Sequence, residues 1–208
     1  MKKTIICNIP MKKDVHHCVY QSSDSSIPSS EKAVMYPVNA YLESVLSVDE
    51  EVKLVLLLKH DKNNEEYYKR NADNFVEEFC TICGRNAADV EVKLIETEFE
   101  EEKLVHEKLL KEIVAEIDDN SNVVADITYG SKDVPIVLFA ALTFAEKYLN
   151  CMVDEIVYGQ ATIKNNMPSN TKLCSMLPLF LLNSVVNLIQ CADTTKARRM
   201  LDALLSLK

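Results

Sequence analysis

The sequence predicts an α/β protein with a mostly parallel sheet, helices on both faces and a helical segment at the C-terminal end. Short apolar runs alternate with longer amphipathic runs along the 208 residues, and this alternation is typical of repeated strand–helix–strand units. One short run, "VKLVLLL" (Val52–Leu58), is almost entirely apolar, as expected for a strand that is buried on both faces. The hydrophobic fraction of 48% allows a sizeable core, so the predicted fold is Rossmann-like.

The first half of the chain contains two expected strands and two expected helices. "TIICNI" (Thr4–Ile9) has the composition of a strand, and the serine-rich segment Gln21–Ser30 is expected to be a loop. Ala33–Leu46 has helical spacing, with Pro37 either in the first turn or breaking the helix. The run Asn64–Gly84 predicts a longer helix, which its final glycine would cap.

The second half repeats this alternation. Val90–Glu96 alternates as a strand does, and Glu100–Ile117 has helical spacing with acids at its start, where they favour the helix dipole. The apolar run Asn122–Thr128 predicts a buried strand, Lys132–Leu149 a helix, and Val153–Gly159 a fifth strand. Because helices separate the five strands, we expect right-handed crossovers and a doubly wound sheet.

Beyond about Asn170 the pattern changes to two helices. These are "LPLFLLNSVVNLIQ" (Leu177–Gln190) and "TTKARRMLDALLSL" (Thr194–Leu207). We therefore divide the chain into a sheet domain, residues 1–170, and a C-terminal helical extension, residues 171–208.

The charge and glycine content exclude several functions. The net charge is −9, which argues against binding long DNA or RNA, because that needs a basic surface. Eleven acids and four lysines lie between Glu91 and Asp119, whereas the first thirteen residues carry four lysines and no acid. A small anionic ligand in a local basic pocket stays possible. The three glycines are too scattered for a dinucleotide-binding fingerprint or a P-loop.

The seven cysteines are odd in number and widely spread, which indicates a reduced, cytoplasmic protein. No cofactor or metal site is expected, because neither "HHC" (His16–Cys18) nor "CTIC" (Cys80–Cys83) has further ligands at suitable spacing. The apolar core of the N-terminal segment is too short for a signal peptide. The longest apolar runs fall short of the roughly 20 residues of a membrane span, so no membrane role is expected.

Ligands of open parallel sheets bind beyond the carboxyl ends of the strands. This rule selects the segments Asn8–Lys13, Lys59–Asn63, Thr128–Asp133 and Tyr158–Lys164.

The most informative of these segments lies in "DITYGSKDVP", from Asp126 to Pro135. A carboxylate buried at Asp126 must accept hydrogen bonds, and it would thereby orient the loop that follows. That loop offers hydroxyls, an aromatic ring, a cation and a glycine at the start of a helix, where an anion is favoured. On this pattern alone, an ordinary strand-to-helix turn capped by Ser131 or Asp133 explains the residues equally well.

The segment resembles the D-x-T-H-G-[FY]-R-x-x-P motif of the CARF domains of accessory proteins in type III CRISPR systems. Other landmarks agree in order: a first strand ending in a basic loop, "EIVYG" after the motif helix, and "LPLFLL" opening the helix beyond. The resemblance spans the chain from Thr4 to about Leu205. Two positions depart from the motif, because Tyr129 replaces the usual histidine and Lys132 the usual arginine.

CARF domains bind cyclic oligoadenylates across the dyad of a homodimer, and the resemblance implies the same antiviral sensing here. The expected ligand is cyclic tetra-adenylate, with the tri- and hexa-adenylate rings as alternatives. The C-terminal helices would dimerise or pass the signal to an effector domain or protein. The implied ligand-binding residues follow the first and fourth strands: Asn8, Ile9, Pro10, Met11, Thr128, Tyr129, Gly130, Ser131 and Lys132.

Two alternatives stay open. A stand-alone ring nuclease would degrade the same ligand, but Tyr129 is a poor general base because the pKa of tyrosine is about 10. His16 or His17 would assist only if their loop folds over the ligand, so no catalytic residue is assigned. The HEPN-type RNase pattern R-x-x-x-x-H is absent from the sequence. Without the resemblance, a flavodoxin-like or other mononucleotide-binding enzyme is the remaining interpretation.

Overall fold

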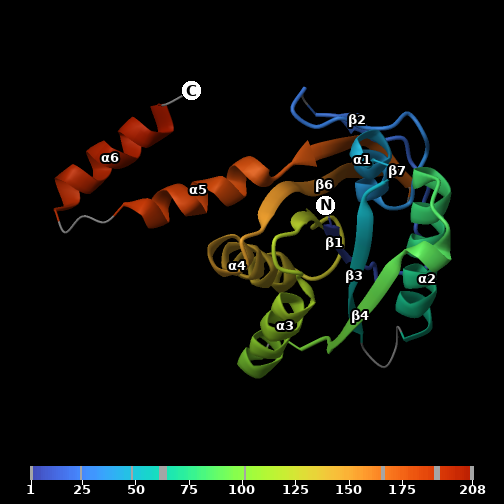
Figure 1. Cartoon of the computed structure of the whole chain (residues 1–208). Coiled ribbons are helices and arrows are strands. Elements are labelled where there is room, and N and C mark those ends of the chain that lie inside the picture. The colour runs from blue at the N-terminus through green and yellow to red at the C-terminus, as the bar shows by residue number, and fades with distance from the viewer. Residues whose placement is uncertain are drawn as a thin grey trace.

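The computed structural model describes residues 2–23, 25–47, 49–60, 65–100, 102–164, 167–189 and 193–206. These residues form a seven-stranded sheet in the order β2-β7-β6-β5-β1-β3-β4 (Figure 1). The parallel part of the sheet contains β1 (Lys2–Asn8), β3 (Glu51–His60), β4 (Glu91–Glu98), β5 (Asn122–Asp126) and β6 (Met152–Lys164). These are the five strands predicted from the sequence, and the Rossmann-like α/β fold class is confirmed.

Helices cover both faces of the sheet (Figure 1). One face packs against the first two helices and the other against the next two, in separate cores. The neighbours Ile5 and Ile6 belong to opposite cores and are both fully buried, because successive side chains of a strand point to opposite faces. The four helices are α1 (Pro37–Val45), α2 (Glu65–Cys83), α3 (Lys103–Glu116) and α4 (Asp133–Tyr148).

Proline and glycine determine two helix boundaries. α1 begins at Pro37, so it is shorter at its start than the predicted helix from Ala33. Proline suits the first turn because it lacks the N–H group that would have no partner there. Tyr36, directly before the helix, is extended, and Val34 forms an isolated bridge with Cys18. α2 ends before Gly84, whose φ of 63° confirms the predicted C-cap.

The sheet extends further than the sequence analysis predicted. β6 does not end at Gly159 but continues to Lys164 and forms an antiparallel pair with β7 (Met167–Ser175). β2 (Gln21–Ser22) lies in the predicted serine-rich loop and pairs with β7. The helical extension therefore starts at α5 (Leu177–Leu188) and not at residue 171, because the residues before it bond within the sheet.

α5 and the last helix, α6 (Thr194–Ser206), extend away from the sheet (Figure 1). Phe180 of α5 is fully buried, and its ring meets that of Phe139 edge-on at 5.5 Å. In the part of the chain that the structure describes, no helix combines the length and apolar character needed to cross a membrane. The described cysteines carry free thiols, while Cys191 lies outside the described residues.

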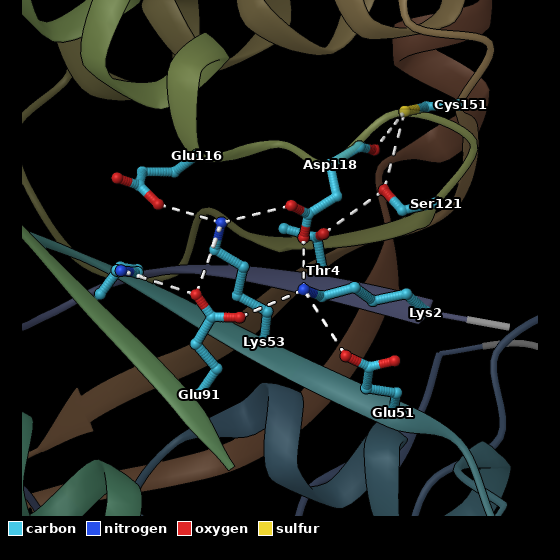
Figure 2. Close-up of polar contacts among 10 residues, drawn as sticks. Lys2, Thr4, Glu51, Lys53, Glu91, Glu116, Asp118, Ser121 and Cys151 are labelled. Atoms are coloured by element: carbon cyan, nitrogen blue, oxygen red, sulfur yellow. Dashed lines mark hydrogen bonds and ion pairs between the residues drawn. The ribbon is translucent and has the colours of Figure 1, made fainter.

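A network of charged side chains lies at the amino ends of the central strands (Figure 2). Lys2 Nζ lies 2.9 Å from a carboxylate oxygen of Asp118 and 3.1 Å from one of Glu91. Lys53 is buried, and its Nζ lies 3.0 Å from Glu116. These ion pairs neutralise part of the acidic segment Glu91–Asp119. They lie at the amino ends of the strands, whereas a ligand is expected at the carboxyl ends, so we assign them a role in stability.

Candidate functional site

The chain turns to one side of the sheet after β1 and to the other after β5, so the two strands border a switch point where open sheets bind ligands. The loops that follow them are in contact. Gly130 has a φ of 94°, and a Cβ placed there would lie 3.3 Å from Asn8 Cγ. Asn8 itself is only 2% exposed, and its side-chain nitrogen has no hydrogen-bond partner among the described residues. Glycine at position 130 therefore allows the close approach of the two loops.

Asp126, at the end of β5, is fully buried and links the motif loop to α1. Its carboxylate accepts hydrogen bonds from the backbone N–H of Thr128, at 2.6 Å, and from that of Val38, at 3.2 Å. Burial raises the pKa of Asp126 to about 6, although these hydrogen bonds oppose the rise. The orienting role that the sequence analysis expected for Asp126 agrees with these contacts.

The next two residues connect the loop to neighbouring elements. Thr128 Oγ1 accepts a hydrogen bond of 2.8 Å from the backbone N–H of Gly159 in β6. The Tyr129 hydroxyl donates to the carbonyl of Met35 at 2.8 Å, and its ring meets that of Tyr36 edge-on at 6.3 Å. Burial raises the pKa of Tyr129 well above its usual value, so this hydroxyl does not supply a base near pH 7.

The loop after β1 is fixed by side chains of α2. Asn71, which is 1% exposed, donates from Nδ2 to the carbonyls of Pro10 at 2.7 Å and Lys12 at 2.9 Å. The Arg70 guanidinium donates to the carbonyl of Lys13. The backbone of this loop is therefore held in place by α2, on the face of the sheet that α1 and α2 cover.

The start of α4 carries both a cation and an anion. Lys132 precedes the helix and is exposed. Asp133 Oδ2 lies 2.6 Å from Lys59 Nζ and 3.1 Å from His106 Nε2. Burial opposes ionisation here, but the hydrogen bonds from Lys59 and Ser131 hold the pKa of Asp133 below its usual value. This ion pair fastens the start of α4 to the end of β3.

An open cleft of about 510 Å³ lies beside the motif loop at the carboxyl ends of β5 and β6. Aromatic and basic side chains dominate the wall nearest to that loop. The hairpin of β6 and β7 forms the opposite wall. The lining residues are Lys12, Lys13, Asp14, His16, Tyr20, Thr128, Tyr129, Tyr158, Gly159, Ala161, Ile163 and Pro168.

Of the nine residues predicted to bind ligand, Thr128 and Tyr129 line this cleft. Asn8, Ile9 and Pro10 are buried beneath the loops, and Met11 is half-buried. Gly130, Ser131 and Lys132 continue from the motif loop to the start of α4 and do not contribute to the lining. The structure thus brings the two predicted loops together but places a different set of side chains in the cleft. The last residues of the predicted loop Lys59–Asn63 lie outside the described residues.

The other lining residues were not among those predicted to bind a ligand. The adjacent residues Lys12 and Lys13 lie in the loop after the first strand. Their segment was therefore selected by the rule that ligands bind beyond the carboxyl ends of parallel strands. His16 was considered as a metal ligand, which was rejected, and as an assisting base. Tyr20 and Pro168 had no detectable signal, because Tyr20 directly precedes β2 and Pro168 lies in β7, and neither strand was predicted.

The scan against protein-family models found no match, and neither did the search of curated proteins. Among the described residues, no three His, Cys, Asp or Glu side chains are grouped closely enough to hold a metal ion. The cleft itself offers a ligand the ammonium groups of two lysines, one carboxylate, one imidazole and tyrosine side chains.

Proposed function

We propose that the chain is a homodimeric, CARF-like sensor that binds a cyclic oligoadenylate across its dyad and relays binding through α5 and α6. The observation that carries the proposal is the cleft of about 510 Å³ at the carboxyl ends of parallel strands, beside the loop that resembles the CARF motif. Lys12 and Lys13 line it and suit phosphates, and the partly exposed ring of Tyr158 suits an adenine. The −9 charge of the chain favours such a local anion site over an extended nucleic-acid surface.

The size of the cleft supports a ligand shared between two chains. Its volume lies within the range of small-molecule pockets, about 300–1,000 Å³. A ring of several nucleotides needs more contacts than one such cleft provides. A two-fold dimer would present the same cleft twice to a symmetric ring.

Exposed apolar side chains on α4 and α5 support the dimer. Ile136 and Tyr148 of α4 are 73% and 71% exposed, and Val186 of α5 is 55% exposed. Leu179 and Leu182 lie on the same side of α5 as Val186, at helical spacing, and both are exposed. Large apolar side chains exposed along one side of a helix are typical of an interface.

Titration with cyclic tri-, tetra- and hexa-adenylate tests the sensor proposal. We expect one ring to raise the melting temperature and to bind in calorimetry with one ring per two chains. Linear tri-adenylate serves as the matched control, because it has the same bases and phosphates without the closed ring. If no ring raises the melting temperature, or if one ring binds per chain, the dyad proposal is wrong.

A slow ring nuclease is the second candidate, and His16 is the observation that favours it. His16 lines the cleft together with Lys12 and Lys13, and a neutral imidazole is the usual general base near pH 7. Incubation of purified protein with cyclic tetra-adenylate should then yield linear products at a rate that His16→Ala lowers about a hundredfold or more. Intact ring after long incubation, or equal cleavage by His16→Ala, would exclude this role.

A further inference from the structure

Lys12 has an unusual position for an exposed lysine. Its ammonium nitrogen lies over the ring of Tyr129, 5.2 Å from the ring centroid. The electron-rich face of an aromatic ring attracts a cation at this distance. The contact therefore holds a positive charge at the wall of the cleft, where a free lysine would sample many conformations.

Both partners of this contact are held by separate hydrogen bonds. The hydroxyl of Tyr129 donates to the carbonyl of Met35 at 2.8 Å, which fixes the plane of the ring. The backbone of Lys12 accepts from Asn71 Nδ2 at 2.9 Å. The backbone carbonyl of Asn71 also accepts a hydrogen bond from the hydroxyl of Tyr36. The ring of Tyr36 in turn packs against that of Tyr129. One buried residue of α2 thus positions both the lysine and the ring.

We propose that Lys12 is the principal phosphate-binding cation of the cleft, with Tyr129 as its platform and Asn71 as a positioning residue. Lys132, the cation that the CARF resemblance favours, is exposed at the start of α4 and does not line the cleft. A ring face that carries an ammonium group is not open to an adenine base, so base stacking falls to Tyr158, which is 36% exposed, because Tyr20 is only 4% exposed. The inference rests on the proposed function for the identity of its ligand.

The first experiment compares three lysines by the same substitution in the full chain. Lys12→Gln should weaken binding of cyclic tetra-adenylate at least about tenfold, because a hydrogen bond to a charged group is lost. Lys132→Gln should weaken it less than Lys12→Gln does. Lys147→Gln, at the far end of α4, controls for the change in net charge and should leave the affinity within about twofold. ATP is titrated in parallel as a second anionic probe.

The second experiment tests whether Tyr129 and Asn71 act through Lys12. Tyr129→Phe keeps the ring face but loses the hydrogen bond to Met35, so it should weaken binding by no more than about threefold, whereas Tyr129→Leu, which removes the ring, should weaken it further. Asn71→Asp replaces the donor with an acceptor that faces two carbonyls. The losses from Tyr129→Leu and Asn71→Asp should largely disappear in the Lys12→Gln background, since coupled residues are not additive. A merely structural role would lower the affinity equally in both backgrounds.

The outcomes separate this inference from the proposed function. If the ring binds but Lys12→Gln costs no more than Lys147→Gln, or less than Lys132→Gln, the inference is wrong and the sensor proposal stands. If only ATP binds, and Lys12→Gln weakens it, the assignment of Lys12 stands without the cyclic ligand. Binding of neither probe to the wild type would overturn both.

Discussion

Asp126 provides a sensitive test of the geometry at the candidate site, through the substitution Asp126→Asn. The carboxylate is fully buried and accepts hydrogen bonds from the N–H groups of Thr128 and Val38. Asparagine has almost the same shape but brings two N–H donors. One of them would have to face the N–H of Val38, which would then lose its acceptor.

The expected magnitude depends on pH. Burial raises the pKa of Asp126 from 3.8 to about 6, so the folded state binds this proton more tightly than the unfolded state. Stability from this group is fully present below pH 4 and is lost as the pH rises through 6. The loss amounts to about 3 kcal/mol, since each tenfold change in proton affinity is worth about 1.4 kcal/mol. Asparagine does not titrate and lacks this dependence.

The assay is urea unfolding of both proteins at pH 4, 5, 6 and 7. At pH 4 the buried Asp126 is protonated, but both of its oxygens still accept hydrogen bonds, whereas the amide nitrogen of asparagine accepts none; Asp126→Asn should therefore be less stable than the wild type by about 1–2 kcal/mol. By pH 7 the variant should have gained about 3 kcal/mol relative to the wild type. The exposed Asp73→Asn, on α2, controls for general charge effects. A stability difference that stays constant from pH 4 to 7 would refute the reasoning.

Three further predictions follow from packing, charge and the exposed helices. Gly159→Ala should destabilise the fold by about 1–3 kcal/mol in urea unfolding, because its Cβ would overlap the ring of Pro37; a change under about 0.5 kcal/mol would contradict this. The hydrogen bond from Lys2 lowers the pKa of Glu91, so its stabilisation is present above the usual glutamate pKa and is lost as the pH falls. Glu91→Gln should therefore cost about 0.5 kcal/mol at pH 7 and almost nothing at pH 3, and an equal cost at both would count against the ion pair. Leu182→Glu, at a 44% exposed position of α5, should convert the proposed dimer to a monomer in sedimentation velocity, and a variant that stays dimeric would place the interface elsewhere.

The sequence by itself determined the parallel part of the sheet and the helices between its strands. A strand buried on both faces must be apolar along its length, so "VKLVLLL" was recognisable from local pattern alone. The positions of Pro37 and Gly84 also have local causes, because proline has a fixed φ and no N–H group, whereas glycine readily adopts the positive φ of a helix C-cap. The motif loop was found in the same way, since Asp126 is a carboxylate inside an apolar run.

Only the tertiary structure decided how the sheet ends and which side chains share the cleft. β7 contains polar residues such as Ser169 and Thr171, and it is a strand because β6 offers partners for its backbone, which no local pattern indicates. Lys12 and Tyr129 lie far apart in the sequence and meet because β1 and β5 are neighbours in the sheet. Asn71 joins them from α2 through hydrogen bonds whose partners are set by helix packing. Such contacts depend on which strands are neighbours and where the helices pack. Both are decided by how the whole chain buries its apolar side chains, not by any local segment.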